Sequence, residues 1–178
     1  LVKHPMLAGF DHRGRLFIAA SSGKNIGSGD LLKDPPNLIR MIADTDGDGV
    51  FDRSTVFADK MTLPMGALWH RGALYVASPP NIWRLRDLDD DGVADERTIL
   101  VDTFGFSGNA ASVHGCFLGP NGRLYWCDGR HGHEFRDKDG ELTSKGKAAR
   151  IFSCRLDGSD VRTWCGGGMD NPVEVDFL

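Results

Sequence analysis

Two kinds of hairpin-like segment alternate along the chain three times, and this repetition limits the possible folds more than any other feature of the sequence. The first kind has an apolar stretch, a turn that ends in glycine and a β-rich stretch, and it occurs at 8–20, 66–78 and 115–129. The second kind has two strand-like stretches around an acidic or glycine-containing turn, and it follows at 37–59, 81–102 and 149–166. Each pair of segments therefore predicts four antiparallel strands.

A repeat of about 45–55 residues with four strands has the size of a propeller blade. The sequence therefore predicts an all-β protein, a β-propeller in which helix is the minority state. The blade-like units lie at 5–60, 63–102 and 111–166, and 167–178 begins a further unit. A β-sandwich with accidental internal similarity is the alternative. Because propellers close with about 4–8 blades, we expect this chain to be an open piece of a larger propeller.

The negative charge of the chain is concentrated in two short loops. The formal net charge is −4, and nine aspartates lie at 44–52 and 87–95, so that 21 basic residues stand against 16 acidic ones elsewhere. The basic residues form no stripe interleaved with aromatics, which disfavours a nucleic-acid surface. No apolar run approaches the roughly 20 residues of a transmembrane helix. The chain begins at Leu1, so we expect that it has been trimmed or excerpted, in which case an export signal could be missing.

The two acidic loops, DTDGDGVFD and DLDDDGVAD, share the pattern D-x-D-x-D-G-x-x-D. Carboxylates at alternate positions can wrap a hard cation and glycine permits a sharp turn, so the sequence predicts a calcium ion in each loop. The loops are not EF-hands, because Thr55 and Thr98 stand at the twelfth position, where an EF-hand has glutamate. A solvated hairpin tip is the alternative. The predicted ligands are Asp44, Asp46, Asp48 and Asp52 in the first loop and Asp87, Asp89, Asp91 and Asp95 in the second.

The loops resemble the calcium-binding hairpin loops of integrin α-subunit propellers at every aspartate and at the glycine. That resemblance implies that the backbone carbonyls of Val50 and Val93 complete the ligand sets. We expect such ions to be structural, because a filled oxygen cage on a peripheral hairpin has no open position for chemistry. The third unit has only LDGSD at 156–160, which is too few carboxylates for a site.

The four cysteines form two pairs with the same spacing, Cys116/Cys127 and Cys154/Cys165. If Asn121-Gly122 is a two-residue hairpin tip, Cys116 faces Cys127, and the LDGSD turn centres the second pair in the same way. The spacing thus predicts cross-strand neighbours that can form disulfides, and four buried thiols are the alternative. Disulfides would indicate a periplasmic or extracellular location. The sequence contains no C-x-x-C-H haem motif.

The densest group of chemically versatile side chains lies at 112–135 and comprises His114, Asp128, Arg130, His131, His133 and Glu134. Such residues on connections near a propeller channel are candidates for catalysis. His114 precedes the inner hairpin and is the candidate general base, which needs a hydroxyl within hydrogen-bond reach. His131, His133 and Glu134 form a possible metal cluster, although a surface loop is the simpler interpretation of H-x-H among glycines.

The run H-G-x-x-x-G-P-N-G-R-L-Y at 114–125, the following Asp128-Gly129, and GGGMDNPVEVDF at 166–177 resemble the six-bladed propellers of soluble quinoprotein glucose and sorbosone dehydrogenases. The likeness is greatest to the related propeller of proteins described as membrane-bound dehydrogenases, which often continue into helical repeats and a c-type haem domain. The resemblance implies a six-bladed propeller that oxidises a sugar or other alcohol with pyrroloquinoline quinone. A c-type cytochrome domain or another acceptor is then the expected partner.

The same resemblance assigns roles to four residues. It implies that His114 takes the substrate hydroxyl proton, that Asp128 orients this base, and that Arg130 and Asn171 contact cofactor or substrate. The quinone-binding Arg-Asn-Pro of those enzymes appears here with Asp170 at its first position, which places an anion where an anionic cofactor favours a cation.

Two other functions compete with a quinoprotein dehydrogenase. The first is a non-catalytic, exported propeller that binds a glycan or a protein, with the acidic loops serving stability alone. The second is a propeller hydrolase that uses calcium at its channel, which would need carboxylates on inner loops. The acidic loops lie on the second hairpin of each unit, away from the expected channel.

Overall fold

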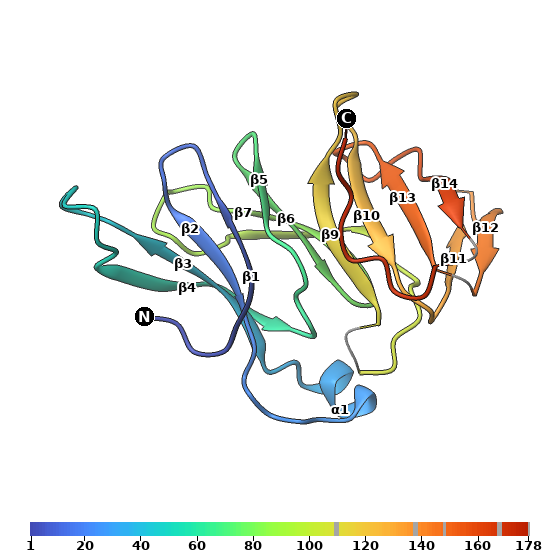
Figure 1. Cartoon of the computed structure of the whole chain (residues 1–178), viewed down its shortest axis with the longest axis horizontal. Helices are drawn as coiled ribbons and strands as arrows, with labels where there is room; N and C mark the ends of the chain where they lie inside the picture. Colours follow the sequence, from blue (N-terminus) through green and yellow to red (C-terminus); the bar gives the residue numbers. More distant parts are fainter. Residues whose placement is uncertain (109–110, 137–138, 148, 167–168, 178) are drawn as a thin grey trace.

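The computed structural model describes residues 1–177 except 109–110, 137–138, 148 and 167–168. The described residues form three four-stranded antiparallel sheets that stand side by side, one two-stranded sheet and a short helix (Figure 1). The chain is therefore a partial β-propeller, as the repeated hairpins predict, and each four-stranded sheet is one blade.

Each blade follows the chain from its inner to its outer strand. The first contains β1 (Pro5–Phe10), β2 (Leu16–Ala20), β3 (Asn37–Ala43) and β4 (Arg53–Met61). The second contains β5 (Leu68–His70), β6 (Ala73–Ser78), β7 (Asn81–Arg86) and β8 (Glu96–Val101). The third contains β9 (Val113–Leu118), β10 (Leu124–Asp128), β13 (Arg150–Cys154) and β14 (Arg162–Gly166).

The remaining elements are α1 (Ser28–Lys33), between β2 and β3, and the hairpin of β11 (His133–Arg136) and β12 (Leu142–Gly146). Among the described residues, no helix has both the length and the apolar character needed to traverse a bilayer.

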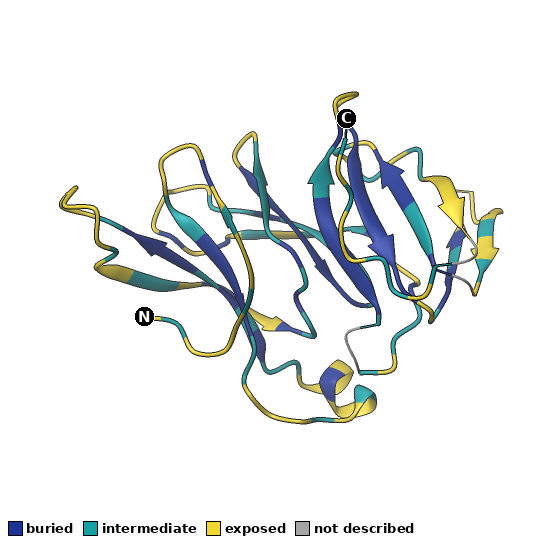
Figure 2. Ribbon diagram, viewed as in Figure 1, coloured by how far each residue is buried: buried dark blue, intermediate teal, exposed yellow. Residues whose placement is uncertain are grey.

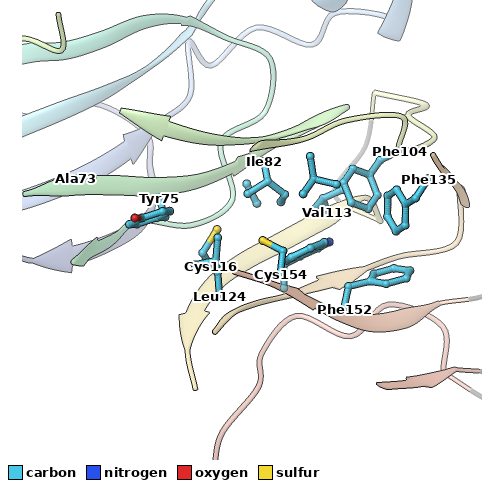
Figure 3. Close-up of a cluster of buried hydrophobic side chains, with 13 residues drawn as sticks. Ala73, Tyr75, Ile82, Phe104, Val113, Cys116, Leu124, Phe135, Phe152 and Cys154 are labelled. Atoms are coloured by element: carbon cyan, nitrogen blue, oxygen red, sulfur yellow. The ribbon is translucent and has the colours of Figure 1, made fainter. Parts of the chain in front are cut away.

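The middle blade shows why these sequences form stacked sheets. Every residue of β6 is buried, because alternate side chains enter different cores. Leu74 and Val76 pack with the first blade, whereas Tyr75 and Ala77 pack with the third (Figure 3 labels Tyr75). A sheet covered on both faces gives such continuous apolar strands. Full burial of Leu74 or Val76 stabilises the fold by about 1.5–3 kcal/mol each.

The inner strands approach one another almost backbone to backbone. A Cβ atom added to Gly9 of β1 would lie 2.0 Å from the carbonyl oxygen of Ala67, and one on Gly66 would lie 1.4 Å from that of Gly115. The backbone N–H of Gly115 also donates to the Met65 carbonyl at 2.9 Å. Glycine is thus required where the blades converge on the propeller axis.

The β11–β12 hairpin is inserted in the chain between the second and third strands of the third blade, and no pattern in the sequence indicates it. The start of this hairpin bonds to the loop after β8, where the Gly105 N–H donates to the Gly132 carbonyl at 2.7 Å. Phe104 from that loop and Phe135 from β11 pack edge to face at 5.1 Å, close to Phe152 of β13 (Figure 3). An aromatic contact therefore holds the insertion on the blade.

The predicted cysteine pairing is wrong. Gly119 N–H bonds to the Arg123 carbonyl, so the β9–β10 tip has three residues instead of two, and a bulge follows at Cys116. Cys127 consequently faces His114.

The second predicted pair fails in the same way, because Cys165 faces Ile151 and not Cys154. All four cysteines are free, three of them are buried, and burial raises the pKa of Cys127 and of Cys154 to about 12. The alternative of buried thiols therefore describes three of the four, while Cys165 is exposed.

Candidate functional site

A cavity of about 450 Å³ lies where the inner strands converge. Its wall is formed by β1, the 65–67 segment before β5, β9 and the C-terminal segment, which runs beside β9 in Figure 1. Most of the lining is apolar, with Met6, Met65 and Phe117 among its residues. His114 and Glu174 are the titratable imidazole and carboxyl groups in this lining. The cavity therefore combines apolar walls with a few polar groups, as ligand sites do.

His114 lies on β9 and lines this cavity, whereas the sequence pattern places it on the connection that precedes the inner hairpin. His114 is only 2% exposed. A side chain fixed on the inner strand of a blade is well suited to hold one orientation toward a ligand. Whether His114 acts as a base stays a prediction.

Asp128 does not meet His114. In the β9–β10 ladder His114 faces Cys127, and Asp128 faces Val113. Neighbouring residues of a strand point to opposite faces, so the two side chains lie on opposite sides of the sheet. The expected arrangement, with Asp128 orienting His114, is therefore not formed. Asp128 is fully buried instead, and burial raises its pKa to about 7.

Arg130 and Asn171, which are expected to contact a cofactor, contact residues of the chain instead. Arg130 donates a hydrogen bond to the Asp170 carboxylate at 2.9 Å, and both side chains are largely exposed. Asn171 lies against Gly129, where an added Cβ would be 3.0 Å from the Asn171 side-chain oxygen. These residues do not fit an anionic quinone, because Asp170 neutralises Arg130, the cation expected to bind it.

The histidines at 131–133 do not gather with Glu134 into a metal-binding group among the described residues. The His131 ring bonds to Ser107, and the His133 ring bonds to Ser144. Glu134 pairs with Lys145 at 2.6 Å and with Arg136 on the exposed side of the hairpin.

The acidic loops bring their carboxylates together at the tips of the β3–β4 and β7–β8 hairpins. One oxygen from each of Asp44, Asp46 and Asp48 lies within 4.8 Å of the others. The same holds for Asp87, Asp89 and Asp95. Oxygens on opposite sides of a calcium ion lie about 4.6–5.2 Å apart, so these donor sets fit that ion.

The predicted fourth ligands, Asp52 and Asp91, lie outside these groups of three. Asp52 accepts hydrogen bonds from the Thr45 backbone N–H and hydroxyl, and Asp91 accepts one from the Val93 N–H at 2.8 Å.

Backbone N–H groups fix the first carboxylate of each loop in the same way. Asp44 accepts hydrogen bonds from Gly49 at 2.9 Å and from Gly47 at 2.7 Å, and these bonds lower its pKa. Asp87 accepts the corresponding bonds from Gly92 at 3.0 Å and from Asp90 at 2.7 Å. The two loops therefore share one backbone conformation despite different residues between the aspartates.

The second loop also contacts the first blade. Asp90 forms ion pairs with Arg13 and Arg15 from the β1–β2 tip. Thr55 of β4 donates its hydroxyl to the Gly92 carbonyl at 3.0 Å. In the first loop the position of Asp90 is occupied by Gly47. The second loop thus joins two blades. Asp90, which is not one of the predicted calcium ligands, supplies the negative charge of this contact.

Comparison with known proteins gives the family and the fold. A family model described as "Domain of unknown function (DUF7133)" matches residues 1–170. A search of the curated proteins gives no match. A chain in the crystal structure of a nidogen/laminin complex is similar with a TM-score of 0.59 and 17% identity, over 93% of this chain and 49% of that one. This chain thus spans about half the length of that neighbour, and the likeness shows the propeller fold alone. Because the family model matches nearly the whole sequence, the chain belongs to the family described as "Domain of unknown function (DUF7133)".

Proposed function

We propose that this chain is a calcium-stabilised propeller module that binds a small hydroxylated molecule, a sugar or another alcohol, in the cavity between its inner strands. The observation that carries the proposal is the composition of that cavity, in which His114 and Glu174 stand among mostly apolar residues. A sugar offers apolar C–H faces to such walls and hydroxyl groups to the two polar side chains. The volume of about 450 Å³ is in the range of small-molecule sites.

Each polar residue has a distinct task in this proposal. The His114 imidazole donates to or accepts from a ligand hydroxyl, and the Glu174 carboxylate accepts a second hydroxyl hydrogen. The calcium ions in the acidic loops support the blades and do not touch the ligand, since neither loop lines the cavity. A periplasmic or extracellular location, where calcium is abundant, accompanies this proposal.

Binding can be tested by calorimetric or NMR titration of the chain with a panel of monosaccharides, short glycans and simple alcohols. We expect His114→Ala to weaken the binding at least tenfold, and Glu174→Gln to weaken it less. The matched control is His12→Ala, because His12 is exposed outside the cavity. Glu174 is exposed, so its variant tests the cavity without disturbing the core. The proposal fails if nothing in the panel binds, or if both cavity variants bind as the wild type does.

Oxidation of the bound alcohol is the second candidate function, and the position of His114 in the cavity favours it. His114 would accept the hydroxyl proton, and the hydride would pass to a two-electron acceptor added to the chain. Pyrroloquinoline quinone is disfavoured in this role, because Asp170 pairs with Arg130. Reduction of an artificial acceptor after addition of quinone, calcium and alcohol would support turnover, and loss of the signal in His114→Ala would tie it to this residue. Ligand binding without any turnover would favour a binding module.

A further inference from the structure

A pair of buried polar side chains lies on the third blade, outside the lining of the cavity. Asp128 ends β10 and His133 begins β11, and both side chains are 0% exposed. Among the described residues, the two Asp128 carboxyl oxygens have no hydrogen-bond partner, and the His133 Nδ1 has none either. Asp128 Oδ2 and His133 Nδ1 face each other at 4.0 Å. Buried polar groups without hydrogen-bond partners are uncommon, so two of them side by side need one common explanation.

The surroundings of the pair are apolar. The His133 ring lies 4.7 Å from the Phe152 ring and 4.8 Å from the Phe135 ring. Burial raises the pKa of Asp128 to about 7 and lowers the pKa of His133 to about 4. Between these values the carboxyl is protonated and the imidazole is neutral. The two groups are therefore not an ion pair, although their spacing would allow one.

Arg150 is the charged group that faces the pair from the neighbouring strand. It lies opposite Asp128 in the β10–β13 ladder, and it lowers the pKa of both Asp128 and His133, although burial has the larger effect on each. A Cβ on Gly146 of β12 would lie 2.9 Å from an Arg150 guanidinium nitrogen and 3.1 Å from the His133 ring. The guanidinium is thus beside the imidazole.

Among the described residues of β9, β11 and β12, no further charged group is directed at the pair. On β12, Ser144 bonds to the His133 Nε2 at 2.9 Å. Glu134 of β11 is engaged with Lys145 of β12 and with Arg136. On β9 the residue opposite Asp128 is Val113, and His114 points to the other face.

We propose that Asp128 and His133 are a proton-exchanging pair, which keeps the docking of the β11–β12 hairpin independent of pH in the mildly acidic range. When the hairpin is docked, the proton is on the Asp128 carboxyl and His133 is neutral. When it detaches and both groups are hydrated, Asp128 loses its O–H proton and His133 gains one at Nδ1. One proton is therefore bound in either state, and none is exchanged with the solvent overall.

The two contributions cancel because their pH windows overlap. The docked Asp128 binds its proton more tightly than a hydrated aspartate, whose pKa is near 3.8. Its contribution to the stability of the docked hairpin therefore decreases as the pH rises from 4 to 7. A hydrated histidine binds a proton below about pH 6.5, whereas the docked His133 binds one only near pH 4. Its contribution to the stability of the docked hairpin therefore decreases as the pH falls from 6.5 to 4. Between about 4 and 6.5 the opposite slopes offset each other.

Replacing either residue of the pair should reveal the pH dependence of stability that the other residue causes. Relative to the wild type, we expect Asp128→Asn to lose stability as the pH falls from 6.5 to 4.5, because only the His133 contribution remains. His133→Gln should gain stability over the same interval. Each difference should approach about tenfold in the unfolding equilibrium constant per pH unit. The double variant should again follow the wild-type profile. Urea unfolding at a series of pH values, with hydrogen exchange of the β11–β12 amides, measures these slopes.

Direct NMR titration of the wild type gives an independent test that needs no variant to fold. At pH 5.5 the Asp128 side-chain carbon should report a protonated carboxyl and the His133 ring a neutral imidazole. A His133 that titrates near 6.5, an Asp128 that titrates near 4, or single variants with pH profiles parallel to the wild type would overturn the proposal. Ligand binding in the cavity is measured separately, so either proposal can fail alone.

Discussion

Single residues decide how closely the blades can approach, and Gly66 is the most constrained of them. Alanine at this position would place its Cβ 1.4 Å from the Gly115 carbonyl oxygen, which belongs to the backbone of β9 and cannot rotate away. We expect Gly66→Ala to destabilise the protein by about 3 kcal/mol or more, measured by urea unfolding. Gly27→Ala is the matched control, because nothing lies within 4 Å of its added Cβ. Equal stability of the two variants would contradict the close approach of the inner strands.

The residue scale also shows which part of the site could be predicted from the sequence. The hairpin pattern places His114 directly before an inner hairpin, and the structure places it on β9, beside the cavity. The neighbours of Asp128 could not be predicted, since they depend on the length of the turn and on the bulge at Cys116. A shift of one residue moves a side chain to the other face of a strand. The same shift separates Cys127 from Cys116 and brings His133, instead of His114, to Asp128.

Elements are joined to one another by side chains whose roles emerge only when blades pack. Asp90 joins the β7–β8 loop to Arg13 and Arg15, and its backbone has a positive φ of 62°. We expect Asp90→Asn, which tolerates this backbone and removes the charge, to cost about 0.5–1 kcal/mol at low salt and less at high salt. Thermal unfolding at two salt concentrations without calcium measures the loss. Asp102→Asn, at an exposed aspartate outside the loop, should change little; an equal loss there would show that net charge and not the contact is responsible.

The elements that the sequence predicted and missed differ in their apolar pattern. The blade hairpins alternate or fill with apolar residues because both faces of each sheet are covered. The strand β12 reads LTSKG and is mostly exposed, so it carries no strand signal of its own (Figure 2). Its pairing depends on His133 and Phe135 of β11, which are anchored in the aromatic cluster. Tertiary contacts therefore create this hairpin, and a local pattern could not reveal it.

At the scale of the whole molecule, three blades share two apolar cores, and the middle blade contributes to both. The acidic loops differ in their relation to this arrangement. The loop at 87–95 bonds to the first blade, whereas the loop at 44–52 lies at an exposed tip at the side of the fan of sheets (Figure 2). An ion in the second loop would therefore be linked to unfolding of two blades, and an ion in the first to the fraying of one hairpin.

This difference predicts unequal effects of calcium. At calcium concentrations about 100-fold above the dissociation constant, a site that exists only in the folded protein adds about 2.7 kcal/mol, or roughly 5–10 °C in melting temperature. We expect calcium to raise the melting temperature and magnesium to do so far less, because magnesium demands a stricter octahedral shell. Asp87→Asn should remove more of the calcium gain than Asp44→Asn, because its loop spans two blades.

Asp157→Asn in the third blade is the matched control for these variants. Its turn contains an aspartate that accepts hydrogen bonds from Ser159, but it has too few carboxylates for an ion. This variant should lower the baseline melting temperature slightly and keep the full calcium gain. A melting temperature that does not respond to calcium would refute the metal sites, and a gain that survives in the double variant of Asp44 and Asp87 would place the ion elsewhere. If the gain is lost equally in both single variants, the first loop is as firmly tied to global unfolding as the second, and the contacts of Asp90 add no linkage between the ion and the neighbouring blade.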